Sequence, residues 1–151
     1  MERISDRELQ IYRTLEAPVE LVWKAWTEPE HIAKWWGPAG FSNTIYKMDV
    51  KPGGEWLLTM HGPDGKNYPD KSVFREIDPL KKIVIEHLTP HFIITVVFET
   101  REEGTYMQWN SLFDTKELLD SLIKNVKADT AQIENVDKLE EHLQQLSGNK
   151  N

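Results

Sequence analysis

The sequence contains no cysteine, an absence that excludes disulfides, thiolate metal ligands and cysteine nucleophiles. It has no run of about 20 apolar residues, which a membrane-spanning helix requires. The opening residues, MERISDRELQ, lack the apolar stretch of a secretory signal peptide. Positive charge is scarce, since 18 Lys and Arg stand against 25 Asp and Glu and leave a net charge of −7. Because a phosphate-binding surface needs a basic excess, we expect a cytoplasmic protein that neither binds nucleic acid nor inserts into a membrane.

Motifs for common enzyme chemistry are missing as well. There is no G-x-S-x-G, P-loop or dinucleotide glycine fingerprint, so nucleophilic catalysis and nucleotide binding have no support in the sequence. We expect no cofactor. His61, His87 and His91 are the candidates for metal binding or acid–base chemistry, but they form no HExxH or equivalent pattern. Pro90 also prevents a shared helical face for the last two. We therefore predict no metal site and interpret His61 as a solvated strand residue.

Tryptophan, in contrast, is concentrated in one segment, Ala17–Phe41. Four of the six tryptophans lie there: Trp23, Trp26, Trp35 and Trp36. Pro18 and Pro29 each suit the first position of a helix, and Gly37-Pro38 ends the second one. The segment therefore predicts two short helices. Helices this short need an apolar surface to pack against, which the rest of the chain must supply.

The remainder of the chain reads as a sheet followed by a helix. Apolar and polar residues alternate in seven segments separated by short turns: Glu8–Glu16, Phe41–Val50, Glu55–His61, Asn67–Ile77, Lys82–Leu88, Phe92–Arg101 and Thr105–Phe113. From Asp114, which forms a possible capping box with Glu117, the spacing becomes helical, with a possible break near Lys127–Thr130. We predict an α+β domain in the order β-αα-β6-α, with a curved antiparallel seven-stranded sheet around a long C-terminal helix.

Three pieces of sequence carry a resemblance to a known family. APVELVWKAWTEPEHIAKWWGPAGF, KPGGEW…MHGPDG and FREIDPLKKIV resemble the small bacterial branch of the activator of heat-shock protein 90 ATPase family. That family is part of the START-like (SRPBCC, birch-pollen-allergen-like) superfamily. The resemblance covers about residues 8–146, so we expect residues 1–151 to form a single domain. It implies a helix-grip fold, in which the sheet and the C-terminal helix enclose an apolar cavity and the two short helices close one end.

The candidate ligand contacts are the aromatic, methionine and aliphatic residues of the inward strand faces and of the helical segment. They are Trp35, Trp36, Phe41, Trp56, Leu58, Met60, Phe74, Val96, Phe98, Met107 and Trp109. Such side chains suit an adaptable apolar pocket, but they equally suit a solid core, so the sequence leaves both interpretations open. Adjacent helical residues diverge by about 100°, so at most one of Trp35 and Trp36 is expected to face a cavity while the other packs outward.

Glu76 is the one candidate catalytic residue. It is expected to share a strand face with Phe74, and if that face points inward, burial would raise the pKa of the carboxyl group and make it a candidate general acid. If it points outward, Glu76 is a solvated sheet residue.

The leading functional hypothesis is binding of a small hydrophobic molecule that is lipid-like, aromatic or polycyclic. One alternative is an enzyme of the polyketide cyclase or dehydratase type that uses a buried acid. Another is a co-chaperone-like partner of heat-shock protein 90, which we disfavour because we expect the separate N-terminal domain of full-length activators to be missing.

Overall fold

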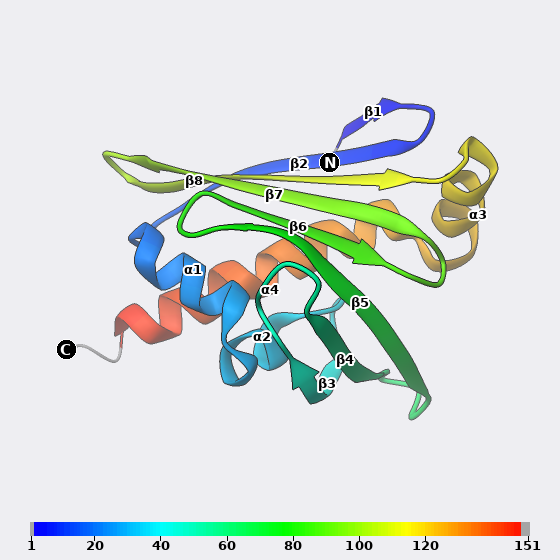
Figure 1. Ribbon diagram of the computed structural model, residues 1–151, viewed down its shortest axis with the longest axis horizontal. Helices are drawn as coiled ribbons and strands as arrows, with labels where there is room; N and C mark the ends of the chain where they lie inside the picture. Colours follow the sequence, from blue (N-terminus) through cyan, green and yellow to red (C-terminus); the bar gives the residue numbers. More distant parts are fainter. Residues whose placement is uncertain (1, 149–151) are drawn as a thin grey trace.

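The computed structural model describes residues 2–148, which form one antiparallel sheet and four helices (Figure 1). The elements are β1 Glu2–Ser5, β2 Glu8–Leu15, α1 Val19–Thr27, α2 Pro29–Trp35, β3 Ser42–Met48, β4 Glu55–His61, β5 Asn67–Asp78, β6 Lys82–His87, β7 Phe92–Arg101, β8 Gly104–Phe113, α3 Lys116–Val126 and α4 Ala128–Gly148. Their order in the sheet is β1-β2-β8-β7-β6-β5-β4-β3.

The sheet curves over α4, and α1 and α2 close one side of the enclosure while α3 lies at the N-terminal end of α4 (Figure 1). This arrangement confirms the predicted α+β helix-grip fold. The sheet has eight strands rather than seven, because β1 was not predicted from the sequence. All four residues of β1 are exposed, so this strand carries no alternation of apolar and polar residues that could have revealed it.

The two-helix segment forms as predicted, with Pro29 at the start of α2. Helix α2 ends at Trp35, and Trp36 already has extended backbone, with φ −66° and ψ 139°. The two indoles therefore do not follow helical geometry, and both are buried, Trp35 at 0% and Trp36 at 8% exposure. The expectation that one of them packs outward is wrong, because it assumed that the helix includes both residues.

The C-terminal helical region is interrupted where the sequence indicated. Lys127 adopts a left-handed conformation with φ 53°, which ends α3 and allows α4 to begin at Ala128. The cap of α3 differs from the prediction, since the Thr115 hydroxyl, not Asp114, accepts a hydrogen bond from the Leu118 N–H at 3.0 Å. Within residues 2–148, no helix combines the length and apolarity that crossing a membrane would require.

The main hydrophobic core lies between the inner face of the sheet and α4. Strand residues pointing inward meet Val136, Leu139 and Leu143 of the helix, each at most 3% exposed. A smaller cluster of Leu9, Phe113 and Leu119 fixes α3 against the sheet. The core is thus continuous with the two-helix segment, whose buried indoles enter it from one side.

Polar contacts fasten α4 to its surroundings. Arg13 of β2 donates from Nη1 to Asp137 at 2.9 Å and to Glu140 at 3.2 Å. The Lys138 ammonium group donates to carbonyl oxygens in the segment that links α2 to β3, and burial lowers its pKa although Glu134 opposes the shift. These contacts fix the position of α4 over the inner face of the sheet.

Candidate functional site

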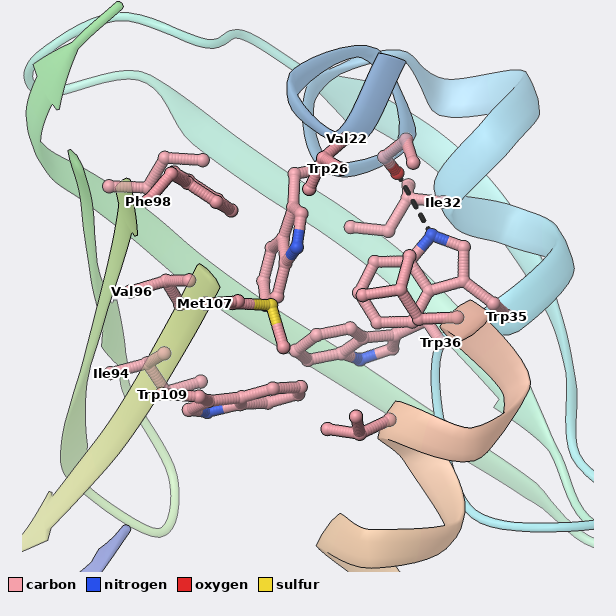
Figure 2. Packing of buried hydrophobic residues seen from close by; sticks show 14 of the residues in the cluster. Val22, Trp26, Ile32, Trp35, Trp36, Ile94, Val96, Phe98, Met107 and Trp109 are labelled. Atoms are coloured by element: carbon pink, nitrogen blue, oxygen red, sulfur yellow. Dashed lines mark hydrogen bonds between the residues drawn. The ribbon is translucent and has the colours of Figure 1, made fainter. Parts of the chain in front are cut away.

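Five tryptophans from four elements and one linker meet at the centre of the interior. We call this set, Trp26, Trp35, Trp36, Trp56 and Trp109, the tryptophan cluster. Figure 2 labels all of its members except Trp56. Trp26 lies edge-on to Trp35 and to Trp109, with ring centroids 4.9 and 5.0 Å apart. Trp36 stacks on Trp109, with centroids 5.5 Å apart and planes 12° from parallel. These geometries are the favourable ones for aromatic pairs.

The indole N–H groups of the cluster are unequally satisfied. Trp35 donates from Nε1 to the Ala25 carbonyl at 2.9 Å, the dashed line in Figure 2. In contrast, the Nε1 atoms of Trp26, Trp56 and Trp109 have no hydrogen-bond partner within the described part of the chain, although these side chains are at most 3% exposed. An unpaired buried donor costs about 1–3 kcal/mol. Three such donors in one interior are therefore a feature that needs a physical explanation.

Helix α4 adds two further unpaired polar atoms. In residues 2–148, neither Asn135 Oδ1 nor Gln132 Nε2 has a partner, and Asn135 is only 7% exposed. The interior thus contains unpaired donors on the sheet and the two-helix segment, and an unpaired acceptor on α4.

Most of the predicted ligand contacts come together in the interior. The buried core contains Trp35, Trp36, Trp56, Leu58, Phe74, Val96, Phe98, Met107 and Trp109, and Met60 packs against it. Phe41 is the exception, because its ring contacts Tyr68 with centroids 5.8 Å apart. Their contact with a ligand stays a prediction, since burial alone does not distinguish a pocket wall from a core residue.

The hollows at the surface of the described residues include one beside α1 and one beside α4. One lies between the start of α1 and the β7–β8 turn, where Glu16, Glu20 and Arg101 are among its lining residues. The other lies between the end of β2 and α4, beside Leu15 and Leu143. Neither hollow is lined by a member of the tryptophan cluster. Because the rings of the cluster pack directly against one another, a ligand there would require side chains to move.

Glu76 faces away from the interior. The pairing of β5 with β6 shifts between Phe74 and Glu76, which is a β-bulge that reverses the alternation. The expectation that Glu76 shares a face with Phe74 is therefore wrong. Its side chain is 52% exposed and lies 3.3 Å from the Lys82 ammonium group, so the outward alternative is the correct one.

Sequence reasoning named His87 as a candidate for metal binding or acid–base chemistry, but it missed Asp70 and the pairing of the two residues on the inner face of the sheet. Asp70 lies two residues before buried Ser72 on β5, and His87 lies two residues after buried Ile85 on β6. Both strands are regular at these positions, and Ser72 pairs directly with His87. Extending the alternation by one step on each strand would have placed both side chains on the inner face.

The two charged side chains contact each other and are nearly enclosed. His87 Nε2 lies 2.5 Å from Asp70 Oδ1, and the two side chains are only 12% and 13% exposed. His87 Nδ1 donates to the Pro90 carbonyl at 2.6 Å, and its ring stacks on Phe92 with centroids 4.3 Å apart. Burial would lower the pKa of His87, but the hydrogen bond and charge of Asp70, together with the Pro90 carbonyl, raise it overall.

The other histidines lie in different surroundings. His91 contacts Asp114 at 2.6 Å and Glu86 at 2.7 Å on the surface, and these carboxylates raise its pKa. His31 Nδ1 lies 3.1 Å from His142 Nε2, which joins α2 to α4. No group of three or more potential metal-ligating side chains occurs among the described residues.

Comparison with solved structures identifies the fold in other proteins. A crystal structure of a protein from Nitrosomonas europaea is 25% identical, with a TM-score of 0.87, over 95% of this chain and 98% of that one. A solution structure from Arthrobacter aurescens has 20% identity and a TM-score of 0.89, over 96% and 90% of the two chains. An AHSA1-like protein from Aeromonas hydrophila has 18% identity and a TM-score of 0.74, over 93% and 94%. The last two support the fold alone.

Comparison with family models identifies the family. No curated protein matches the chain. The model described as Activator of Hsp90 ATPase homolog 1-like protein matches residues 16–147. This range includes the two-helix segment, the six strands β3 to β8, α3 and almost all of α4. This match agrees with the resemblance carried by the tryptophan-rich segment and the glycine turns. The chain therefore belongs to the Activator of Hsp90 ATPase homolog 1-like protein family.

Proposed function

We propose that the protein binds a small hydrophobic molecule with an aromatic or polycyclic body between the sheet and α4. The observation that carries the proposal is the set of unpaired indole N–H groups of Trp26, Trp56 and Trp109 in an enclosed aromatic interior. An acceptor oxygen on an apolar ligand would satisfy such donors, whereas a purely apolar core has no use for them. The START-like fold, which commonly holds hydrophobic ligands, supports the same function.

Binding requires the interior to open, because its aromatic side chains pack against one another. Methionine is the side chain that rearranges most easily. Met107 lies in the core beside the tryptophan cluster (Figure 2), and Met60 packs against the same core. A ligand would thus shift the population toward an open conformation that is minor in the free protein. Glu76, the acid that the enzymatic alternative required, lies on the outer face and gives that alternative no support.

Tryptophan fluorescence tests the proposal directly. We expect 2-acetylnaphthalene, an uncharged aromatic ketone, to change the emission of the cluster saturably, and ligand-observed NMR to report the same dissociation constant. Trp109→Phe removes one unpaired donor and should weaken binding of the ketone. Tyr46→Phe, at a position 66% exposed on β3, is the matched control and should bind normally. Absence of saturable binding by this ketone, by naphthalene and by a fatty acid would contradict the proposal.

A further inference from the structure

The inner face of the sheet, whose buried polar residues include Ser72, Thr105 and Ser111, carries a carboxylate and an imidazole at one end. Asp70 lies directly opposite Leu58 of β4, and Ser72 lies opposite Trp56. Side chains opposite each other in an antiparallel pair are about 4.5–5.5 Å apart at Cβ. A charged carboxylate is thus placed one strand away from the aromatic and aliphatic side chains that are proposed to hold the ligand.

His87 contacts only one of the two carboxylate oxygens of Asp70. Both imidazole nitrogens of His87 are engaged, Nε2 with Asp70 Oδ1 at 2.5 Å and Nδ1 with the Pro90 carbonyl at 2.6 Å. Stacking on Phe92 fixes the plane of the ring as well. Among residues 2–148, no group donates a hydrogen bond to the second carboxylate oxygen, Asp70 Oδ2. Asp70 is therefore oriented by a rigid partner and keeps one acceptor oxygen available.

An ion pair at this position is not explained by stability. Charges removed from water lose solvation that a single contact repays poorly, so replacing such pairs by apolar residues is often neutral or stabilising. The neighbouring inward positions, Ser72 at 2%, Phe74 at 0% and Ile85 at 1% exposure, are closely packed. A paired carboxylate with a free acceptor oxygen at the end of this face has the properties of an anchor for a polar group.

We propose that Asp70, positioned by His87, binds a hydroxyl group of the aromatic ligand, with the ring directed toward Trp56 and the tryptophan cluster. This inference rests on the proposed function and narrows it to a hydroxylated aromatic compound. Because a carboxylate accepts but does not donate, a ligand with a capped hydroxyl loses this contact. A ligand carrying its own carboxylate is repelled.

Three naphthalene probes of similar size test the assignment in the full chain. We expect 2-naphthol to bind about tenfold more tightly than 2-methoxynaphthalene, as a hydrogen bond to a charged acceptor allows, and 2-naphthoate to bind most weakly. Calorimetric titration gives all three dissociation constants. The comparison in the native protein needs no variant and is independent of any folding defect.

Variants then assign the preference to Asp70. Asp70→Asn keeps the shape of the side chain and should bring 2-naphthol and 2-methoxynaphthalene to within about twofold of each other, because the charged acceptor is lost. Glu76→Gln, on the outer face of the same strand, should leave the preference unchanged. Equal binding of the two probes by the native protein, or an unchanged preference in Asp70→Asn, would overturn this inference while leaving the proposed function standing. Failure of all three probes to bind would also overturn this inference, while the proposed function is decided separately by the binding of 2-acetylnaphthalene, naphthalene and a fatty acid.

Discussion

Trp35 and Trp109 have equivalent aromatic surroundings but differ in one hydrogen bond. Each contacts three other rings of the tryptophan cluster within 6.5 Å, counted between centroids. Only Trp35 donates from Nε1 to a backbone carbonyl, that of Ala25. The energetic role of the indole nitrogen can therefore be separated from that of the ring.

We predict that Trp35→Phe destabilises the fold by about 1 kcal/mol more than Trp109→Phe, because it leaves the buried Ala25 carbonyl without its donor. Both changes remove the same volume, so the cavity costs are similar. Urea unfolding, followed by circular dichroism, gives both free energies. Equal losses would show that the Ala25 hydrogen bond contributes nothing to stability.

Gly104 combines a positive φ with a close approach of other backbone atoms. It has φ +138°, and a Cβ added there would lie 2.1 Å from the Leu15 carbonyl oxygen. We predict that Gly104→Ala destabilises the protein by more than about 1 kcal/mol, since the clash involves backbone that cannot move aside. Gly53→Ala is the control, because Gly53 also has positive φ but has no atom within 4 Å of an added Cβ. A similar loss in both variants would attribute the effect to φ rather than to the clash.

At the scale of elements, the loop between α2 and β3 depends on one lysine of α4. Lys138 donates to the Pro38 carbonyl at 3.2 Å and to the Phe41 carbonyl at 3.1 Å. Glu134 of the same helix accepts from the Ala39 N–H at 3.3 Å. Polar groups of α4 thus hold this loop in addition to the apolar contacts of Trp36 and Phe41.

We predict that Lys138→Met increases hydrogen exchange at the Ala39 and Phe41 amides by about tenfold or more, while exchange in β7 and β8 stays unchanged. The reason is that local opening of the loop no longer has to break the lysine contacts, and local openings need not involve the whole fold. Lys24→Met, at an exposed position of α1, is the control. Uniformly faster exchange throughout the sheet would instead indicate global destabilisation.

The elements themselves followed from local patterns, and the departures have local causes. Alternation identified β4 and β7 with correct bounds, and the prolines placed α1 and α2. The β-bulge after Phe74 was not predictable, because the pairing of β5 with β6, rather than the β5 sequence, determines it. The inner-face position of Asp70 and His87 was within reach of alternation, but neither residue looks like a core residue. The polar character of Asp70 and His87 therefore hid an inward position that the alternation of the strands indicated.

At the scale of the whole molecule, histidines in opposite surroundings give stability a pH optimum. Burial, together with the charges of His31 and Lys34, lowers the pKa of His142 below its ordinary 6.5. As the pH falls below 6.5, the unfolded chain takes up a proton that folded His142 resists, so stability is lost toward acid. At higher pH this group is neutral in both states and costs nothing.

His87 and His91 have the opposite effect on the pH dependence of stability, because their pKa values are raised. Asp70 outweighs burial at His87, and Asp114 and Glu86 act on His91, so both pKa values lie above 6.5 in the folded protein. Below pH 6.5 both histidines are charged in either state, and their stabilisation is fully present. It is lost as the pH rises from 6.5 through the folded pKa values.

We predict that the histidine contributions to the free energy of unfolding are greatest near pH 6.5. We call the loss of stability below this pH the acid limb and the loss above it the alkaline limb, and we expect two substitutions to affect them separately. His142→Gln should flatten the fall between about pH 5 and 6.5, since the group that resists protonation is gone. His91→Gln should reduce the fall above pH 6.5. Thermal unfolding at low ionic strength, measured across this range, checks both.

Salt separates the two causes further. His91 is 36% exposed and its partners are surface carboxylates, so salt at about 1 M, where the screening length is about 3 Å, should weaken its contribution to the fall in stability above pH 6.5. His142 is 7% exposed, and burial is the main cause of its lowered pKa. The loss of stability toward acid should therefore persist in the same salt. Loss of both limbs in salt would show that charge on His31 and Lys34, rather than burial, sets the acid response of the helix that covers the sheet.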